Sequence, residues 1–178
     1  MNKKLDIIMG DILEQEVEVI VNPSSATLLE GGQVDSAIRK LGGQELEDEC
    51  KTLHGCPIGE AKVTSAYNLK AKHIIHTPSP IWRGGFFNEE KLLKASYTNS
   101  LKRALELGTK TIAFPSLSTG THNFPLEKAS KLAVESICNF LETHEENLQM
   151  VYLVCYDTQS YDHYRKAYLT HISKAACI

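Results

Sequence analysis

Several features are missing from this 178-residue sequence, and each absence narrows its possible roles. No apolar run approaches the ~20 residues of a membrane-spanning helix, so we expect no membrane contact. No block of Lys and Arg stands out, and the formal net charge is −3. Because nucleic-acid binding needs clustered positive charge that displaces counterions, we expect no nucleic-acid partner. The first apolar run is not followed by Gly-x-Gly-x-x-Gly, which argues against a generic dinucleotide-binding domain.

The sequence also lacks Cys-x-x-Cys pairs, and its number of cysteines is odd. The five cysteines are Cys50, Cys56, Cys138, Cys155 and Cys177. This usage favours reduced thiols in a cytosolic protein over a disulfide framework. His54 lies between two of these cysteines, but nothing nearby supplies a second pair of ligands, so we expect no metal site. The first residues contain no long apolar segment, so we expect no signal peptide.

The length and a hydrophobic content of 42% predict one globular domain over residues 1–178. Apolar runs that indicate strands alternate with patterns that indicate helices. The expected strands are 5–9, 17–21, 61–65, 73–77, 111–114 and 150–156. The expected helices are 34–41, 45–53, 88–107, one beginning near Pro125, and 161–173. This order predicts a three-layer α/β/α fold with a central mixed sheet of about six strands. We expect a monomer.

The segment between the fourth strand and the longest helix also carries local signals. Pro78 and Pro80 favour an extended path, and residues 82–85 (Trp-Arg-Gly-Gly) are typical of a surface loop or mobile lid. Asn88 is a natural N-cap for the helix that follows, and Glu89 suits the positive end of the helix dipole.

Two loops rich in Gly, Ser and Thr each follow an expected strand and precede an expected helix. We call residues 22–38 the first glycine loop and residues 114–125 the second glycine loop. Small residues allow the backbone to approach an anion, and the free N–H groups of a helix N-terminus point towards it. Ligands of such sheets bind at the carboxyl ends of the strands. The pair of loops therefore predicts a ligand with two phosphates.

Six ordered segments carry a more specific signal. They are Gly10-Asp-Ile12, Val21-Asn-Pro-Ser-Ser25, Gly31-Gly-Gln-Val-Asp-Ser-Ala-Ile38, Cys56-Pro-Ile-Gly-Glu-Ala-Lys-Val-Thr64, Ile74-Ile-His-Thr77 and Phe114-Pro-Ser-Leu-Ser-Thr-Gly120. In these segments the sequence resembles the macrodomain family and its MacroD-like branch of hydrolases. The resemblance covers nearly the whole chain in the correct order. It implies recognition of ADP-ribose, of an ADP-ribosylated protein or of O-acetyl-ADP-ribose, with no metal or cofactor.

The resemblance also implies roles for individual residues. The carboxylate of Asp11 would accept a hydrogen bond from the adenine amino group, beside the Ile12 N–H. Asn22 would support the distal ribose, and Tyr156 would stack near the adenine. The backbone of Gly32, Gln33 and Val34 would face the phosphates and the distal ribose. The diphosphate would be cradled from the other side by Ser118, Thr119, Gly120 and Thr121.

Three departures from the family pattern meet at the distal-ribose end. Ser25 replaces an Asn used by hydrolytic members, Gln33 replaces a third glycine, and His122 replaces an aromatic residue that packs on the distal ribose. Asp35, which those members use with the Asn, is retained. His122 then acts either as a general base, since imidazole titrates near neutral pH, or as a packing wall.

Alternative roles remain open for other residues. Asp35 lies in the first turn of a helix, where a carboxylate complements the dipole without catalysis. Asp11 could instead cap the turn after Gly10, although the ordered motifs favour ligand contact, and His76 fits a hydrogen-bonded structural residue. At the level of function, the retained Asp35 favours a hydrolase of ADP-ribosyl esters or O-acetyl-ADP-ribose, with Ser25 and His122 as further candidates. The loss of the Asn at Ser25 favours a reader that binds ADP-ribose without turnover.

Overall fold

The computed structural model describes residues 4–144 and 146–177. Its described residues form a six-stranded sheet with the order β1-β6-β5-β2-β4-β3. The strands are β1 (Leu5–Met9), β2 (Val19–Ser24), β3 (Lys62–Ser65), β4 (His73–Pro78), β5 (Thr111–Pro115) and β6 (Met150–Cys155). All neighbours run parallel except β3 and β4, which are antiparallel. The predicted mixed sheet is confirmed.

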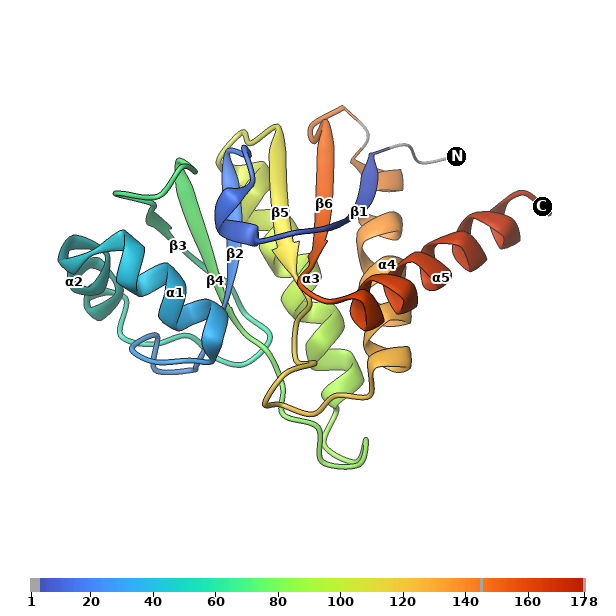
Figure 1. Ribbon diagram of the computed structural model, residues 1–178, viewed down its shortest axis with the longest axis horizontal. Helices are drawn as coiled ribbons and strands as arrows, with labels where there is room; N and C mark the ends of the chain where they lie inside the picture. Colours follow the sequence, from blue (N-terminus) through green and yellow to red (C-terminus); the bar gives the residue numbers. More distant parts are fainter. Residues whose placement is uncertain (1–3, 145, 178) are drawn as a thin grey trace.

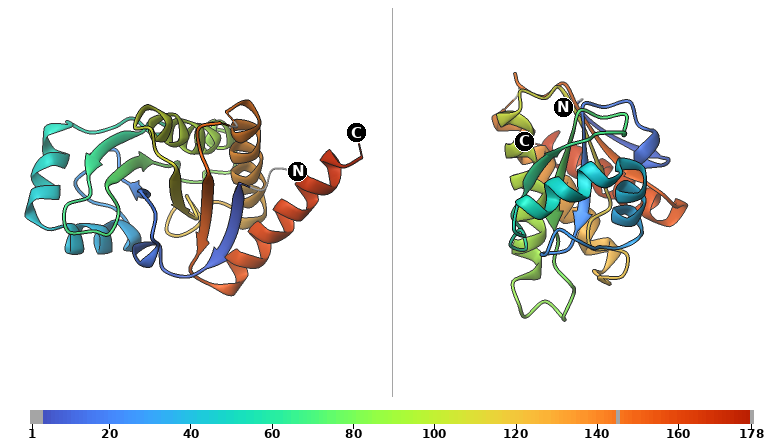
Figure 2. Two further views of the ribbon diagram at one scale, coloured as in Figure 1. Left: turned by 90° about the horizontal axis from the view of Figure 1, so that it is seen from above. Right: turned by 90° about the vertical axis from the view of Figure 1, so that its left-hand side faces the viewer.

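Helices cover both faces of this sheet (Figures 1 and 2). They are the short 3-10 helix η1 (Ile12–Glu14), α1 (Gln33–Gly42), α2 (Gln44–Thr52), α3 (Glu89–Glu106), α4 (Leu126–Thr143) and α5 (Thr158–Ala175). On one face α3 packs against α4, and α5 packs against α4 and the edge strand β1. The helices α1 and α2 lie over the other face, where α1 contacts β2 and α2 contacts β3. The three-layer α/β/α prediction is therefore confirmed.

The central strands are apolar on both sides because both of their faces are covered. Val19 and Val21 of β2 point into the core under α3 and α4, while Ile20 between them points into the core under α1 and α2. In β4 the neighbours Ile74 and Ile75 divide in the same way. Successive side chains of a strand face opposite sides, so a continuous apolar run fills two cores at once.

The strands β2 and β5 separate soon after they begin. Their pairing covers only Val19 with Ile112 and Ile20 with Ala113. Beyond that point β2 remains paired with β4 as far as Ser24 with Pro78, and Ser24 also forms an isolated antiparallel bridge with Gly31 of the first glycine loop. Pro23 lacks an N–H and is therefore tolerated there, because one side of the strand has no partner. The carboxyl ends of β2 and β5 are therefore not paired with each other, and both glycine loops begin there.

The segment before α3 differs from the prediction at two points. Asn88 is the N-cap residue of α3, as predicted, but its side chain makes no capping hydrogen bond and its backbone is left-handed with φ of 60°. Residues 83–88 are exposed, as predicted for a surface loop. Trp82 is half-buried instead, since its ring packs 4.7 Å from that of Phe124.

Among the described residues, no helix combines the length and the apolar character required to cross a bilayer.

Candidate functional site

A cleft of about 390 Å³ lies at the carboxyl ends of β1, β5 and β6, beside the start of α1. Its walls come from four separate parts of the chain. The lining residues are Gly10, Asp11, Ile12, Leu13, Gln33, Val34, Ala37, Pro115, Ser116, Thr119, Gly120, Val154, Tyr156, Asp157 and Ser160. The volume falls within the range of about 300–1,000 Å³ usual for small-molecule sites. Both glycine loops contribute to this cleft, as the sequence predicted.

The first glycine loop supplies the start of α1 to the cleft. Gly32 is the N-cap residue of α1 and makes no side-chain capping bond. The first N–H groups of the helix are therefore available to an anion, at the positive end of the dipole. A Cβ atom at Gly32 would lie 3.9 Å from Thr121 Oγ1. The two glycine loops thus face each other across a short gap.

The second glycine loop is held from beneath by two fully buried tyrosines. The hydroxyl of Tyr97 accepts from the Leu117 N–H at 3.2 Å, and the hydroxyl of Tyr164 lies 2.7 Å from Ser116 Oγ. Ser116 in turn is hydrogen-bonded to Thr119. Burial raises the pKa of Tyr164 to about 12, so its hydroxyl stays protonated. These contacts fix the loop before any ligand arrives.

Ser118 in the same loop has a left-handed backbone with φ of 64°. Its hydroxyl donates to the Pro80 carbonyl at 2.7 Å. A serine in this conformation costs free energy and persists only where its surroundings impose it. The bond to Pro80 is one such constraint, and it ties the second glycine loop to the segment that follows β4.

Asp11 and Tyr156 are at the opposite end of the cleft, after β1 and β6. The Asp11 Oδ1 atom accepts the Leu13 N–H at 2.9 Å, so Asp11 does cap the turn after Gly10. Its carboxylate is nevertheless exposed in the cleft and has further acceptor capacity. Tyr156 is 84% exposed, which leaves its ring free to cover a ligand.

A buried polar network lies behind the first glycine loop. Asn22 Nδ2 donates to Asp35 Oδ1 at 2.7 Å and lies 3.1 Å from His76 Nδ1. His76 Nε2 lies 2.8 Å from the hydroxyl of Thr64. The prediction that His76 is a hydrogen-bonded structural residue is confirmed. Asn22 Oδ1 has no hydrogen-bond partner among the described residues, an exception of the kind that tends to accompany functional sites.

Arg39 completes this network and was not predicted from the sequence. Its Nε donates to Asp35 Oδ2 at 2.8 Å, and its Nη2 donates to the Leu28 carbonyl at 2.6 Å. Burial opposes the charge of Arg39, but the Asp35 carboxylate outweighs it and holds the pKa of the guanidinium above its usual value. Both oxygens of Asp35 therefore accept from buried donors. The i,i+4 spacing of Asp35 and Arg39 on α1 was the available signal.

The chain resembles known proteins over nearly its whole length. The family model of the Macro domain matches residues 21–133. This chain belongs to the macrodomain family. A macro domain-containing protein of Methanosarcina mazei is 48% identical over 92% of this chain and 87% of its own length. An O-acetyl-ADP-ribose deacetylase of Escherichia fergusonii is 42% identical over 90% of this chain and 92% of its own length.

Solved macrodomain structures are also similar to this chain in fold. The Oceanobacillus iheyensis macrodomain with ADP has a TM-score of 0.91 and 34% identity, covering 97% of this chain and 94% of that chain. The Trypanosoma brucei macrodomain in complex with ADP-ribose has a TM-score of 0.86 and 32% identity, covering 92% of this chain and 68% of that chain.

The macrodomain cleft includes about half of the residues predicted for ligand binding. Those that line it are Asp11, Ile12, Gln33, Val34, Thr119, Gly120 and Tyr156. Asn22 and Asp35 are fully buried behind the first loop, while Ser118 is buried within the second. Gly32 faces Thr121 at the rim. Ser25 and His122 are half-buried, and the Ser25 hydroxyl is hydrogen-bonded to Thr27 at 2.8 Å.

The sequence analysis missed part of the cleft wall, including Ala37, Ser116 and Ser160. Ala37 follows the predicted Val34 by about one helical turn. Ser160 lies four residues after the predicted Tyr156, and Ser116 lies two residues before the predicted Ser118. Ser160 is brought in by α5, which begins at Thr158 after its N-cap Asp157, three residues before the predicted start.

Replacing His76 with Gln is expected to flatten the acid dependence of stability. Burial lowers the pKa of His76 to about 3 from 6.5, with a further contribution from the charge of Arg39. Below pH 6.5 the unfolded chain binds a proton that the folded macrodomain excludes. The free energy of unfolding therefore falls as pH drops towards 3, by up to about 1.4 kcal/mol per pH unit.

Urea unfolding of both proteins between about pH 4 and pH 7 measures this slope. Carboxylates titrate equally in both, so the difference between the slopes isolates His76. Identical slopes would contradict a neutral, buried imidazole.

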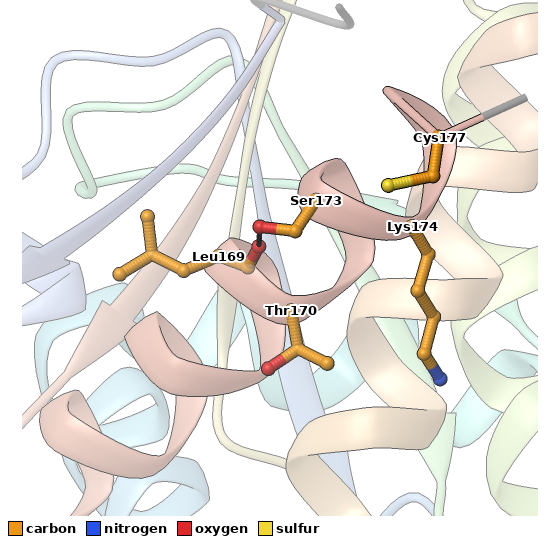
Figure 3. A pocket seen from close by; sticks show the side chains of 5 residues that line it. All are labelled: Leu169, Thr170, Ser173, Lys174 and Cys177. Carbon is orange, nitrogen blue, oxygen red and sulfur yellow. Dashed lines mark hydrogen bonds between the residues drawn. The ribbon is translucent and has the colours of Figure 1, made fainter.

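A second hollow of the macrodomain lies on the outer end of α5 (Figure 3). Its side chains come from the last turns of α5 and from the turn that follows it: Leu169, Thr170, Ser173, Lys174 and Cys177. Within it, the Ser173 hydroxyl donates to the Leu169 carbonyl of the same helix at 2.8 Å. The hollow is far from the strand ends and lacks the converging loops of the main cleft, so we do not assign the ligand site to it.

The five cysteines are free thiols, and four of them are buried. The described residues hold no group of three or more His, Cys, Asp or Glu side chains placed to bind a metal ion. Cys50 lies 3.9 Å from His76 Nε2, and burial raises the pKa of its thiol.

Proposed function

We propose that the cleft binds ADP-ribose and that the chain hydrolyses O-acetyl-ADP-ribose or ADP-ribosyl esters on proteins. The arrangement of the two glycine loops carries this proposal. A helix N-terminus faces a preformed Ser/Thr/Gly loop, which suits a diphosphate held from both sides. Macrodomains solved with ADP and with ADP-ribose are similar over nearly all of this chain.

The adenine is assigned to the end of the cleft at Asp11 and Tyr156. A carboxylate accepts but does not donate hydrogen bonds, so Asp11 selects the exocyclic amine of adenine. The Ile12 N–H lies beside it on the same turn. Tyr156 offers an exposed ring for stacking. The distal ribose then lies near the rim formed by Gly32, Thr121 and His122.

For the chemistry we propose that a water held by the ligand's diphosphate near the start of α1 attacks the acyl carbon of the ester. The bond from that carbon to the ribose oxygen breaks, the acyl group leaves as a carboxylate, and one proton of the water ends on the ribose hydroxyl while the other passes to solvent. Asp35 is enclosed by Asn22 and Arg39. We therefore infer that it fixes the first turn of α1 and does not itself remove a proton. The O-acetyl-ADP-ribose deacetylase of Escherichia fergusonii is a relative at 42% identity, which supports an ester substrate.

A reader of ADP-ribose without turnover is the second candidate. The enclosure of Asp35 favours it, as does Ser25, which occupies the position of a family Asn and bonds to Thr27. Turnover of O-acetyl-ADP-ribose or an ADP-ribosylated protein distinguishes the two functions.

We also propose that residues 1–178 act as one domain and as a monomer in a reducing, cytosolic compartment. The continuous sheet and the buried free thiols support this assignment.

The first experiment is calorimetric titration with ADP-ribose. The wild type is expected to bind, and Asp11→Ala is expected to weaken binding about tenfold, as for loss of a hydrogen bond to a charged group. Asp11→Asn keeps the cap on Leu13 but replaces the negative carboxylate by an amide, so it is expected to weaken binding similarly. Asp48→Ala, which removes an exposed carboxylate on α2, is the matched control and should leave the affinity for ADP-ribose unchanged. Absence of binding by the wild type would refute the proposal.

A further inference from the structure

An exposed aromatic pair protrudes from the segment between β4 and α3. We call residues 81–88 the aromatic loop; it is the green loop that extends lowest in Figure 1. Phe86 is 89% exposed and Phe87 is 60% exposed. Exposed apolar patches and aromatic side chains are typical of surfaces that bind another molecule, because burying apolar area in a complex is favourable.

The backbone of the aromatic loop is fixed although its rings are exposed. Glu89 is only 2% exposed, and its carboxylate accepts the N–H groups of Arg83, Gly85 and Phe87 at 2.8, 3.1 and 2.7 Å. Burial opposes the charge of Glu89, but these donors hold the pKa of its carboxyl below the usual value. A loop ordered in this way presents its rings without an entropic cost of ordering on binding.

The aromatic loop is joined to the second glycine loop. The Trp82 N–H donates to the His122 carbonyl at 2.9 Å, and the Trp82 ring packs on Phe124. Just before the loop, the Pro80 carbonyl accepts from the Ser118 hydroxyl. The base of the aromatic loop is therefore joined to the part of the rim assigned to the distal ribose.

We propose that Phe86 and Phe87 bind the polypeptide to which the ADP-ribosyl group is attached, through apolar side chains next to the modified residue. This inference rests on the proposed function. A protein modified with ADP-ribose is joined through the distal ribose, so its chain leaves the cleft beside His122 and the aromatic loop. Free ADP-ribose and O-acetyl-ADP-ribose end before they reach these rings. The aromatic loop thus selects protein-linked ligand over free ligand.

The test uses two synthetic ADP-ribosyl peptides joined at the distal ribose through a hydrolysis-resistant linkage. One peptide carries leucines on both sides of the modified residue, and the other carries serines. Fluorescence anisotropy is expected to show about tenfold tighter binding of the leucine peptide to the wild type, equivalent to about 1.4 kcal/mol. Phe86→Ser/Phe87→Ser is expected to bind both peptides equally. Leu169→Ser, at an exposed leucine on α5, is the matched control and should keep the preference.

Each outcome has one meaning. Equal binding of both peptides by the wild type, or a preference retained in the double variant, overturns the inference while the proposed function stands. Absence of binding to free ADP-ribose overturns the proposed function itself. If light scattering shows that the wild type dimerises and the double variant does not, the rings serve a second copy of the chain, and the inference is also overturned. Free ADP-ribose should bind the wild type and the double variant alike.

Discussion

Arg39→Met is expected to lower the free energy of unfolding by about 3–5 kcal/mol. The substitution leaves the enclosed carboxylate of Asp35 with the Asn22 amide as its side-chain donor and removes the donor to the Leu28 carbonyl. Breaking one side of a buried ion pair is costly because the other charge stays behind without compensation. For a chain of this size the midpoint of thermal unfolding should fall by about 10 °C.

Chemical denaturation measures this loss of stability, and a double-mutant cycle tests whether it comes from the ion pair between Arg39 and Asp35. Arg39→Met/Asp35→Asn removes both charges and is expected to lose less stability than the sum of the single variants. Arg165→Met, on the exposed side of α5, provides a surface control and should stay within about 0.5 kcal/mol of the wild type. A loss below about 1 kcal/mol for Arg39→Met would mean that water reaches Asp35.

Gly120→Glu is expected to reduce ADP-ribose affinity by about 100-fold or more, or at least about 2.7 kcal/mol. Gly120 lines the cleft, and a Cβ atom built on it meets no other atom within 4 Å. The fold therefore accepts a side chain that the ligand does not. Glutamate adds both bulk and a negative charge where the diphosphate is assigned, and like charges repel strongly where water is excluded.

A substitution series at Gly120 separates bulk from charge. Gly120→Ala should retain most of the affinity, Gly120→Gln should lose part of it, and Gly120→Glu should lose the most. Calorimetry gives the affinities, and thermal unfolding should show unchanged midpoints. If Gly120→Glu bound ADP-ribose as tightly as the wild type, the assignment of the diphosphate to the second glycine loop would be wrong.

The fold was predictable because periodicity and turn residues act locally. The continuous apolar runs of β2 and β4 identify strands covered on both faces, and the predicted order of elements matches the structure. Element ends were less predictable. Asn88 has the right chemistry for an N-cap, but its side chain makes no capping hydrogen bond. The carboxylate of the next residue, Glu89, instead accepts the backbone N–H groups of Arg83 and Phe87 in the loop before α3.

The candidate site was predictable only where it follows sequence motifs. The glycine loops could be found from their composition, because anion binding requires small residues at a helix start. The enclosure of Asp35 could not be found in this way, since it depends on Asn22 of β2 and Arg39 of α1 both reaching its carboxylate in three dimensions. Similarly, nothing in the local pattern of Phe86 and Phe87 indicated that a glutamate further along the chain would hold their backbone in place.

The early separation of β2 from β5 has a mechanical consequence. Two residue pairs join these strands, whereas six join β2 to β4 and five join β5 to β6. The sheet is therefore weakest along one seam, with β2, β4 and β3 on one side and β5, β6 and β1 on the other. The glycine loops leave the sheet on opposite sides of that seam. A diphosphate bound by both loops connects the two halves of the sheet. We therefore expect the ligand-bound protein to resist sliding of one half past the other better than the ligand-free protein does.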